Sequence, residues 1–414
     1  MKIFWLLIMW WLPQTVIPAP FQFLHPLKEG CLPYVEGDSP KVKWKFKTGG
    51  ALFSSPVITG TSVIFGSLDA SLYSLNTETG NLNWKFKTNG EIRSTVCVDN
   101  EKIFLVCGDG LLYSINKNNG TLNWTFKTDG EQTYKYYGYA DYFKSSPVLF
   151  NDAVYFGSGD GNIYSINSTS GKLIWKFKTG DVVHSTPVIY NGKLFAGSFD
   201  GFVYAIDVNT GELIWKFKSV GQRFFPKGEM QGNPVVANNL VYIGSRDYNL
   251  YAIDADEGYC HWNKQFPKGW ALALSVYDSV LYAGASDDDV MISINGKTGQ
   301  ENWRTNVNFN TFGAPAFGGS RMYFGTLLGK LLALDIYTGE IAWSFNTDNF
   351  NSNSKHYFED KLKITKSEFY SKISSPEDYI KALYKLGALF STPAVNNDVI
   401  IFTSTDGSAY CLEK

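Results

Sequence analysis

The sequence has few of the residues that usually build catalytic and metal centres. Its 414 residues include only four histidines, at positions 25, 184, 261 and 356, and their spacing does not match that of a zinc site. It contains neither a glycine-rich phosphate loop nor a Gly-x-Ser-x-Gly nucleophile motif. The formal net charge of −2 gives no general attraction to nucleic acid or to an anionic membrane. We therefore find no complete catalytic constellation in the sequence, and we expect no binding of nucleic acid.

Cysteine is also scarce, and the count is odd. The five cysteines are Cys31, Cys97, Cys107, Cys260 and Cys411. An odd number cannot be fully paired within one chain. Cys97 and Cys107 lie on two arms of a predicted hairpin, in which Cys97 is opposite Phe104 and not opposite Cys107. We expect free, buried thiols and no disulfide framework.

Long apolar runs are absent except near the N-terminus. Lys2 precedes a ten-residue apolar segment, residues 3–12, which is too short to span a bilayer, since a span needs about 20 residues. A basic start followed by a short apolar core is typical of a secretory signal peptide. We assign residues 1–19 to a signal peptide and 20–40 to an N-terminal extension, and we expect export to the periplasm or the cell exterior. An uncleaved anchor and a wrongly assigned start codon remain alternatives.

Internal repetition dominates the chain after residue 40. Ser54–Trp84 aligns with Ser145–Trp175 without a gap, and each copy ends in a tryptophan. The closing tryptophans are Trp44, Trp84, Trp124, Trp175, Trp215, Trp262, Trp303 and Trp343, at intervals of 40, 40, 51, 40, 47, 41 and 40 residues. A period near 40 with several short strands per unit is typical of a β-propeller. We expect the tryptophans to be structural, filling the gaps between neighbouring blades.

The repeat also predicts how many blades there are and how the ring closes. One unit contains four apolar segments, at residues 56–58, 63–65, 72–75 and 82–86, separated by turns. Seven units are complete, whereas Leu389–Leu412 has three strands without a tryptophan and Lys41–Thr48 has the tryptophan strand alone. We predict an all-β, eight-bladed β-propeller over residues 41–414, with four antiparallel strands per blade. The N-terminal strand pairs with the last blade to close the ring, and we expect a monomer.

The repeat resembles that of the pyrroloquinoline-quinone-like (PQQ-like) propeller family. The resemblance rests on Tyr204-Ala205-Ile206-Asp207, Thr210-Gly211-Glu212, Trp215, Gly197-Ser198 and Asp200-Gly201. The family includes quinoprotein dehydrogenases, which hold PQQ over a calcium ion, and the propeller lipoprotein of the outer-membrane barrel-assembly machinery. Several of those dehydrogenases carry adjacent cysteines, which this sequence does not have, and no distinct set of acid and amide residues is evident. We therefore expect no cofactor. PQQ with Ca²⁺ is expected only under the alternative that the protein is a quinoprotein dehydrogenase.

Departures from the repeat fall in connections between blades, which share one face of a propeller. They are Glu131–Phe143, Arg223–Glu229 and a segment at about 347–386. Elaboration of one face of a rigid scaffold usually marks the working face. The candidate ligand- or partner-binding residues are Tyr136, Tyr137, Tyr139, Arg223, Trp270 and His184. A lone polar residue in an inter-blade loop, such as His184, is more often solvated than catalytic, so we expect it to be solvated.

The third insertion contains the signals of a helix. Ser375 fits an N-cap, Pro376 the first helical position and Gly387 the end. Such a helix either lies over the mouth of the propeller or covers a blade edge, and the sequence leaves both open.

The same face carries a recurrent aspartate in the turn between the second and third strands. The seven are Asp69, Asp109, Asp160, Asp200, Asp247, Asp288 and Asp406, with Leu328 in the remaining unit. An ordinary Asp-Gly turn explains them better than a ring of cation ligands, so we expect no metal site.

We therefore expect a non-catalytic binding or scaffolding propeller outside the cytoplasm, whose partner is another protein or a cell-envelope component. A PQQ-dependent quinoprotein dehydrogenase and a carbohydrate-binding or sensor propeller are the alternatives.

Overall fold

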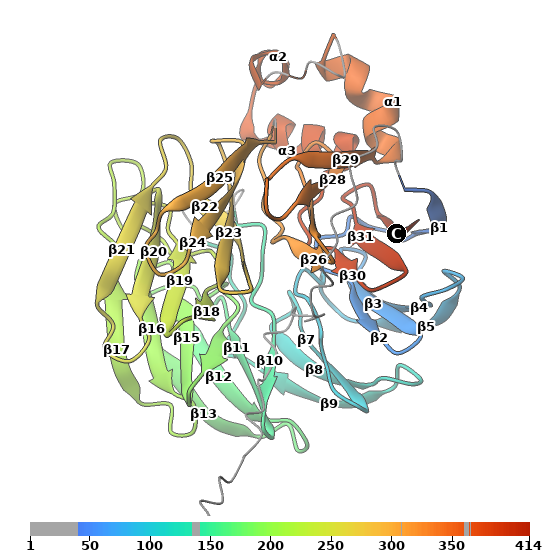
Figure 1. Ribbon diagram of the computed structural model, residues 1–414. Coiled ribbons are helices and arrows are strands. Elements are labelled where there is room, and N and C mark those ends of the chain that lie inside the picture. The colour runs from blue at the N-terminus through green and yellow to red at the C-terminus, as the bar shows by residue number, and fades with distance from the viewer. Residues whose placement is uncertain (1–39, 135–140, 308, 360–363, 365) are drawn as a thin grey trace, which may run out of the picture.

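The chain folds into a ring of eight four-stranded antiparallel sheets around a central channel (Figure 1). The computed structural model describes residues 40–134, 141–307, 309–359, 364 and 366–414. The predicted eight-bladed β-propeller is confirmed. The predicted signal peptide, the N-terminal extension to residue 39 and Cys31 lie outside the described residues.

Each of the first seven blades is continuous in sequence, and its strands are ordered from the channel outward. Blade 1 contains β2 (Val57–Thr59), β3 (Ser62–Ser67), β4 (Ser71–Asn76) and β5 (Leu82–Lys87), and blade 2 contains β6 (Cys97–Val98), β7 (Lys102–Val106), β8 (Leu111–Asn116) and β9 (Leu122–Lys127). Blade 3 contains β10 (Val148–Phe150), β11 (Ala153–Gly157), β12 (Asn162–Asn167) and β13 (Leu173–Lys178). Blade 4 contains β14 (Val188–Tyr190), β15 (Lys193–Gly197), β16 (Phe202–Asp207) and β17 (Leu213–Lys218). Blade 5 contains β18 (Val235–Ala237), β19 (Leu240–Gly244), β20 (Asn249–Asp254) and β21 (Cys260–Gln265). Blade 6 contains β22 (Ala271–Tyr277), β23 (Val280–Ala285), β24 (Val290–Asn295) and β25 (Glu301–Asn306). Blade 7 contains β26 (Ala316–Gly318), β27 (Arg321–Gly325), β28 (Lys330–Asp335) and β29 (Ile341–Asn346).

The eighth blade is assembled from both ends of the described chain. It contains β30 (Ala394–Val395), β31 (Val399–Thr403) and β32 (Ser408–Glu413), with β1 (Val42–Lys47) as its outermost strand. The register places Trp44 opposite Cys411 and Phe46 opposite Ala409. This pairing confirms the predicted closure of the ring and satisfies an edge of β32 that would otherwise be open.

Burial within a blade follows from its place in the ring. The second and third strands are packed on both faces by neighbouring blades, so β15 and β16 are almost continuously buried. The outer strand β17 alternates between exposed lysines and partly buried aromatic residues, and the inner strand β14 is half-buried at its end. Large apolar residues therefore fill the spaces between blades, as the hydrophobic effect requires for sheets that cannot bury both faces alone.

The closing tryptophans join each blade to the next. The indole Nε1 of Trp175 donates a hydrogen bond to the carbonyl of Val208 in blade 4, at 3.1 Å. The same ring lies against Gly211, whose φ is +76°, so closely that a Cβ there would be 2.7 Å from Trp175 Cδ2. Six further pairs repeat this packing: Trp44 with Gly80, Trp84 with Gly120, Trp124 with Gly171, Trp215 with Gly258, Trp262 with Gly299 and Trp303 with Gly339. Trp343 packs between blades 7 and 8 beside Tyr323.

Three helices occupy the connection between blades 7 and 8 and lie together above that side of the ring (Figure 1). They are α1 (Asp348–Tyr357), α2 (Lys366–Ser371) and α3 (Pro376–Leu386). The Ser375 hydroxyl accepts the backbone N–H of Asp378, and Gly387 ends α3 in the left-handed conformation, as the sequence predicted. Within the described residues, no helix has the length and apolar character needed to cross a bilayer.

The cysteines of the described residues are free. Cys107 and Cys411 are buried, as predicted, whereas Cys97 and Cys260 are only half-buried. The register places Cys97 opposite Phe104, as predicted, and burial raises the pKa of the Cys97 thiol to about 11. These thiols are therefore protonated at neutral pH and act as small apolar side chains.

Candidate functional site

The connections between blades and the turns between second and third strands form one face of the ring, which we call the loop face. All three insertions lie on it, because each lies between the last strand of one blade and the first strand of the next. Tyr136, Tyr137 and Tyr139 lie outside the described residues, which include the two ends of their insertion, residues 131–134 and 141–143.

A buried ion cluster holds these two ends against blade 4. It consists of Glu131, Asp141, Lys144 and His184. His184 Nε2 is 2.8 Å from Glu131 Oε1 and its Nδ1 is 2.8 Å from Asp141 Oδ1. Lys144 Nζ is 3.0 Å from the same Glu131 oxygen. His184 is only 1% exposed, so the expectation that it is solvated is wrong; the insertion buries it.

Groups of opposite charge face each other in the cluster. Burial raises the pKa of Glu131, but the hydrogen bond and charge of His184, with the charge of Lys144, lower it to about 2. Burial lowers the pKa of His184, but Asp141 and Glu131 raise it above its usual value of 6.5. The two carboxylates therefore face Lys144 and favour the protonated form of His184, and such pairing is the condition under which buried charges are tolerated.

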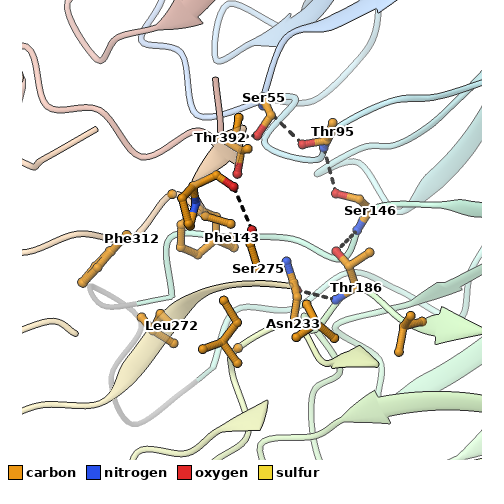
Figure 2. Close-up of a pocket in the computed structure, with 18 of the residues that line it drawn as sticks. Ser55, Thr95, Phe143, Ser146, Thr186, Asn233, Leu272, Ser275, Phe312 and Thr392 are labelled. Carbon is orange, nitrogen blue, oxygen red and sulfur yellow. Dashed lines mark hydrogen bonds between the residues drawn. The ribbon is translucent and has the colours of Figure 1, made fainter. Parts of the chain in front are cut away.

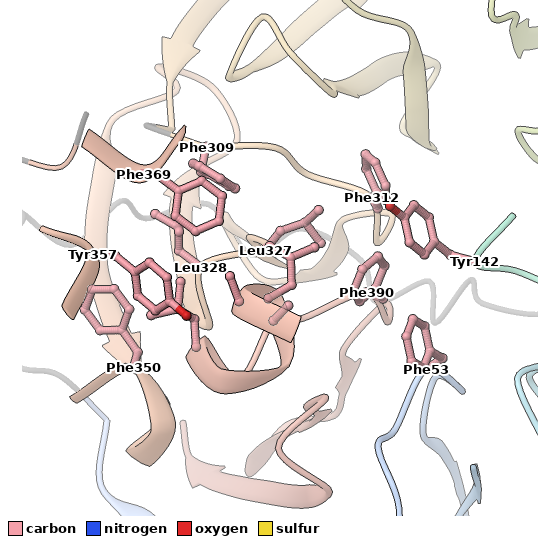
Figure 3. Packing of buried hydrophobic residues seen from close by; sticks show 14 of the residues in the cluster. Phe53, Tyr142, Phe309, Phe312, Leu327, Leu328, Phe350, Tyr357, Phe369 and Phe390 are labelled. Atoms are coloured by element: carbon pink, nitrogen blue, oxygen red, sulfur yellow. The ribbon is translucent and has the colours of Figure 1, made fainter. Parts of the chain in front are cut away.

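Aromatic side chains from opposite sides of the ring meet across its axis. We call this set, Phe53, Tyr142, Phe143, Phe312 and Phe390, the aromatic plug. The ring centroids of Phe53 and Phe390 are 4.6 Å apart, and those of Tyr142 and Phe390 are 5.0 Å apart (Figure 3). Blades 1, 3, 7 and 8 each contribute, so the plug closes the channel at the loop face.

Helix α3 packs on the same apolar cluster as the plug. Leu383 and Leu386 are fully buried in it, and Tyr384 lies with its ring centroid 5.9 Å from that of Phe53. The helix therefore lies over the mouth of the propeller, which decides between the two positions that the sequence left open.

A second buried cation lies beside the ion cluster. Arg246 is 1% exposed, and its Nε and Nη2 donate to Gln231 Oε1 at 3.0 and 2.6 Å. Its guanidinium lies 5.2 Å from the Phe199 ring centroid and 5.5 Å from that of Trp270. The sequence did not single out Arg246, because it precedes the repeated turn aspartate Asp247 and looks like an ordinary turn residue. Its position is apolar or small in most other blades, and that contrast was the available signal.

The remaining candidate residues have different surroundings. Trp270 is half-buried and packs against Phe225, with ring centroids 5.5 Å apart. Arg223 is exposed, with its guanidinium 5.7 Å from the Phe224 ring centroid. The structure thus brings Trp270 to the edge of the Arg246 site and leaves Arg223 on the surface of the second insertion.

The repeated aspartates have a structural task. In blade 4, Asp200 Oδ2 accepts hydrogen bonds from the Tyr204 hydroxyl at 2.6 Å and from the backbone N–H of Gly180 at 2.7 Å. These bonds tie the turn to the incoming connection. The Asp–Tyr bond recurs in five other blades: Asp69–Tyr73, Asp109–Tyr113, Asp160–Tyr164, Asp247–Tyr251 and Asp406–Tyr410.

The channel beneath the plug contains a cavity of 380 Å³ lined by the inner strands. At the end of the cavity nearest the plug, a belt of hydrogen bonds runs from blade to blade (Figure 2). Backbone N–H groups donate to side chains in the order Thr392 to Ser55, Ser55 to Thr95, Thr95 to Ser146, Ser146 to Thr186 and Thr186 to Asn233. Blades 6 and 7 interrupt the belt, because the equivalent residues there are Ala273 and Ala314.

The residues of this channel do not fit PQQ held over calcium. Calcium takes six to eight oxygen ligands, with carboxylates prominent among them. No aspartate or glutamate lines the cavity. Within the described ranges, no group of three or more His, Cys, Asp or Glu side chains is arranged to hold a metal ion.

Comparisons with known proteins agree with the fold. A family model described as outer membrane protein assembly factor BamB matches residues 35–201, 138–224 and 200–361. The structure of BamB from Moraxella catarrhalis superposes with a TM-score of 0.65 at 17% identity, covering 91% of this chain and 98% of that one. A quinohemoprotein alcohol dehydrogenase from Comamonas testosteroni gives 0.68 at 11% identity, covering 90% and 76%. A europium-containing methanol dehydrogenase gives 0.64 at 12% identity, covering 90% and 93%.

At these identities, structural likeness speaks for the fold alone. No curated protein matches the sequence.

Proposed function

The chain belongs to the family of the outer membrane protein assembly factor BamB, and from this premise we propose that it is a non-catalytic binding propeller. In this proposal it acts outside the cytoplasm as a monomer and binds another protein, or a component of the cell envelope, through the loop face. The description of the family, an assembly factor for outer membrane proteins, supports a protein partner.

The observation that carries the proposal is the one-sided elaboration of a rigid ring. The insertions place apolar side chains in solvent on the loop face. Val220 is 77% exposed, Phe224 64% and Tyr370 43%. Other exposed apolar residues, such as Leu82 and Leu173, belong to the repeated outer strands, whereas these three lie in irregular connections that the fold does not require, which favours an interface with a partner.

The contacts that hold the insertions in place favour a binding surface that is already ordered before a partner binds. The first insertion is held by the ion cluster around His184, and the third is packed on the aromatic plug through Leu383 and Leu386. A surface fixed in this way loses little conformational entropy on association.

A quinoprotein dehydrogenase is the second candidate, and the likeness to the two dehydrogenase structures supports only its fold. Because the channel offers no carboxylate to a calcium ion, we derive no reaction from it. A carbohydrate-binding or sensor role would use the same aromatic loops as the first proposal.

Photocrosslinking tests the proposal directly. A photoreactive phenylalanine analogue would replace Phe224 or Tyr370 in the full chain, expressed in its native cells. Leu173 is the matched control, since it is 45% exposed on β13, away from the insertions. We expect discrete adducts with one other protein from the loop-face positions, identified by mass spectrometry.

Adducts from Leu173 as abundant as those from Phe224 would contradict a special role of the loop face. Adducts only between copies of this chain would contradict binding of a different partner by a monomer. A complete absence of adducts from both loop-face positions would also overturn the proposal.

A further inference from the structure

The belt beneath the aromatic plug has unused hydrogen-bond donors. Its hydroxyls accept backbone N–H groups: Thr95 Oγ1 accepts from Ser55, and Thr186 Oγ1 accepts from Ser146, at 3.2 and 3.0 Å. Each hydroxyl still carries a proton. Among the described residues, no protein atom accepts a hydrogen bond from the hydroxyls of Ser55, Thr95, Ser146 or Thr186. These side chains are 7–8% exposed and line the cavity, so their donors face a confined space.

Asn233 adds a donor of a different kind. Its Oδ1 accepts the backbone N–H of Thr186 at 2.7 Å, which fixes the amide plane. Its Nδ2 is therefore left on the side of the cavity, and the residue is exposed to the channel. Five donors from neighbouring blades thus surround one level of the channel.

Charged residues near the belt also favour a ligand that accepts hydrogen bonds. Arg93 and Lys144 line the cavity, and no acidic side chain does. Their carboxylate partners, Glu91 at 2.6 Å and Glu131 at 3.0 Å, are not among the lining residues. Both cations are thus paired with carboxylates that lie outside the cavity. The closed end of the cavity is rich in hydrogen-bond donors and has no acidic lining residue to repel an anion, which suits an oxyanion.

The remainder of the cavity is apolar and leads to the opposite face. Below the belt the inner strands present Ile58, Ile189 and Val236, which are partly exposed. At the other end the plug residues Phe53 and Phe390 are only 2% and 1% exposed. Water therefore reaches the channel from the face opposite the insertions, and the plug closes the loop face.

We propose that this blind channel binds a small carboxylate with an apolar body. The carboxylate lies against the belt hydroxyls and the Nδ2 of Asn233, and the apolar body lies along the inner strands toward the open end. The cavity of 380 Å³ lies within the size range of small-molecule sites, about 300–1,000 Å³. The site goes beyond the proposed function, since the ligand enters from the face opposite the partner-binding loops.

Calorimetric titration of the full chain with octanoate tests the site. We expect octanoate to bind at least about tenfold more tightly than 1-octanol, because only the carboxylate forms charge-assisted bonds with the belt. Acetate, which has no apolar body, gives no heat at the same concentrations. An apolar tetrapeptide, titrated with a free and with an amidated C-terminus, tests which molecule supplies the carboxylate. Binding of the free form as tight as that of octanoate, and lost on amidation, would indicate the C-terminus of a peptide, whereas binding of octanoate alone would indicate a small metabolite.

Asn233→Asp is the diagnostic variant. It keeps an oxygen to accept the backbone N–H of Thr186 but replaces the donor with a negative charge, so octanoate binding should weaken at least about tenfold. Asn209→Asp makes the same change of charge on an exposed turn and should bind octanoate as the parent does.

Circular dichroism of each variant confirms that the ring is intact before titration. The proposal is overturned if octanoate gives no binding heat, if octanol binds as tightly, or if Asn233→Asp leaves the affinity unchanged. Equal weakening by both variants would also overturn it, because the effect would then come from net charge.

Discussion

Replacing Gly211 by alanine tests how the tryptophans join the blades. Gly211 lies at the turn between the third and fourth strands of blade 4, under the indole of Trp175 from blade 3. An alanine Cβ there would lie 2.7 Å from Cδ2 and 2.8 Å from Cγ of that indole. The indole cannot move freely, because its Nε1 is bonded to the carbonyl of Val208 and it is 9% exposed.

The expected cost has two parts that can be separated. A left-handed φ of +76° costs an alanine about 1–2 kcal/mol. Forcing a methyl group into a packed contact adds about 1–3 kcal/mol. Gly192 has nearly the same φ, +74°, but a Cβ there would meet no atom within 4 Å. Gly192→Ala should therefore lose only about 1–2 kcal/mol, and Gly211→Ala about 2–5 kcal/mol.

Equilibrium unfolding in urea, followed by circular dichroism, gives the free energy of unfolding of each variant. The values can be compared if the variants share the m value of the parent, because a changed midpoint then reports a changed stability. In a Trp175→Ala background the clash disappears, so Gly211→Ala should cost no more than Gly192→Ala does. If the two single variants differ by less than about 0.5 kcal/mol, or the cost at Gly211 persists without Trp175, the packing described here does not join the blades.

Four further outcomes follow from the structure. Trp175→Ala should lower the free energy of unfolding by about 3–5 kcal/mol, and an unchanged melting curve would contradict its place in the core. Because the pKa of His184 is raised above 6.5 in the fold, its charge stabilises the protein below pH 6.5. This contribution is lost as the pH rises through the folded pKa. His184→Gln should therefore reduce the loss of unfolding free energy that the parent shows as the pH rises through that pKa, measured by unfolding curves at several pH values. For Glu131, whose pKa falls from 4.5 to about 2, the contribution is present above pH 4.5 and is lost as the pH falls through 2, so Glu131→Gln should reduce the difference in stability between pH 5 and pH 2. Titration with PQQ and Ca²⁺ should give neither heat nor a spectral change, and dye-linked alcohol oxidation would refute the non-catalytic proposal.

The repeated parts of the molecule could be predicted from the sequence, because copies in register predict each other. The strands of blade 1, the split blade that contains Trp44 and the start of α3 at Ser375 all lie within a residue or two of their predicted places. In each case the determinant is local: a turn glycine, a capping hydroxyl or an alternation of apolar residues.

The buried ion cluster could not be predicted in this way. Glu131 and His184 are 53 residues apart, and they meet because an insertion without a repeat equivalent folds back on blade 4. His184 was selected from the sequence, but its burial and its partners follow from that tertiary contact. Arg246 was missed for the same reason, since its aromatic neighbours come from other blades and from the insertions.

The closure of the ring by β1 also determines when folding can finish. β32 begins 361 residues after β1 ends (408 − 47), and chains are synthesised at about 5–20 residues per second. Roughly 20–70 s therefore pass between the synthesis of Trp44 and that of its partner Cys411. Through that interval the lysines of β1, at positions 43, 45 and 47, discourage the unpaired strand from joining another sheet. The pairing of β32 with β1 completes the ring, so a product truncated before β32 remains open however well its other blades have folded.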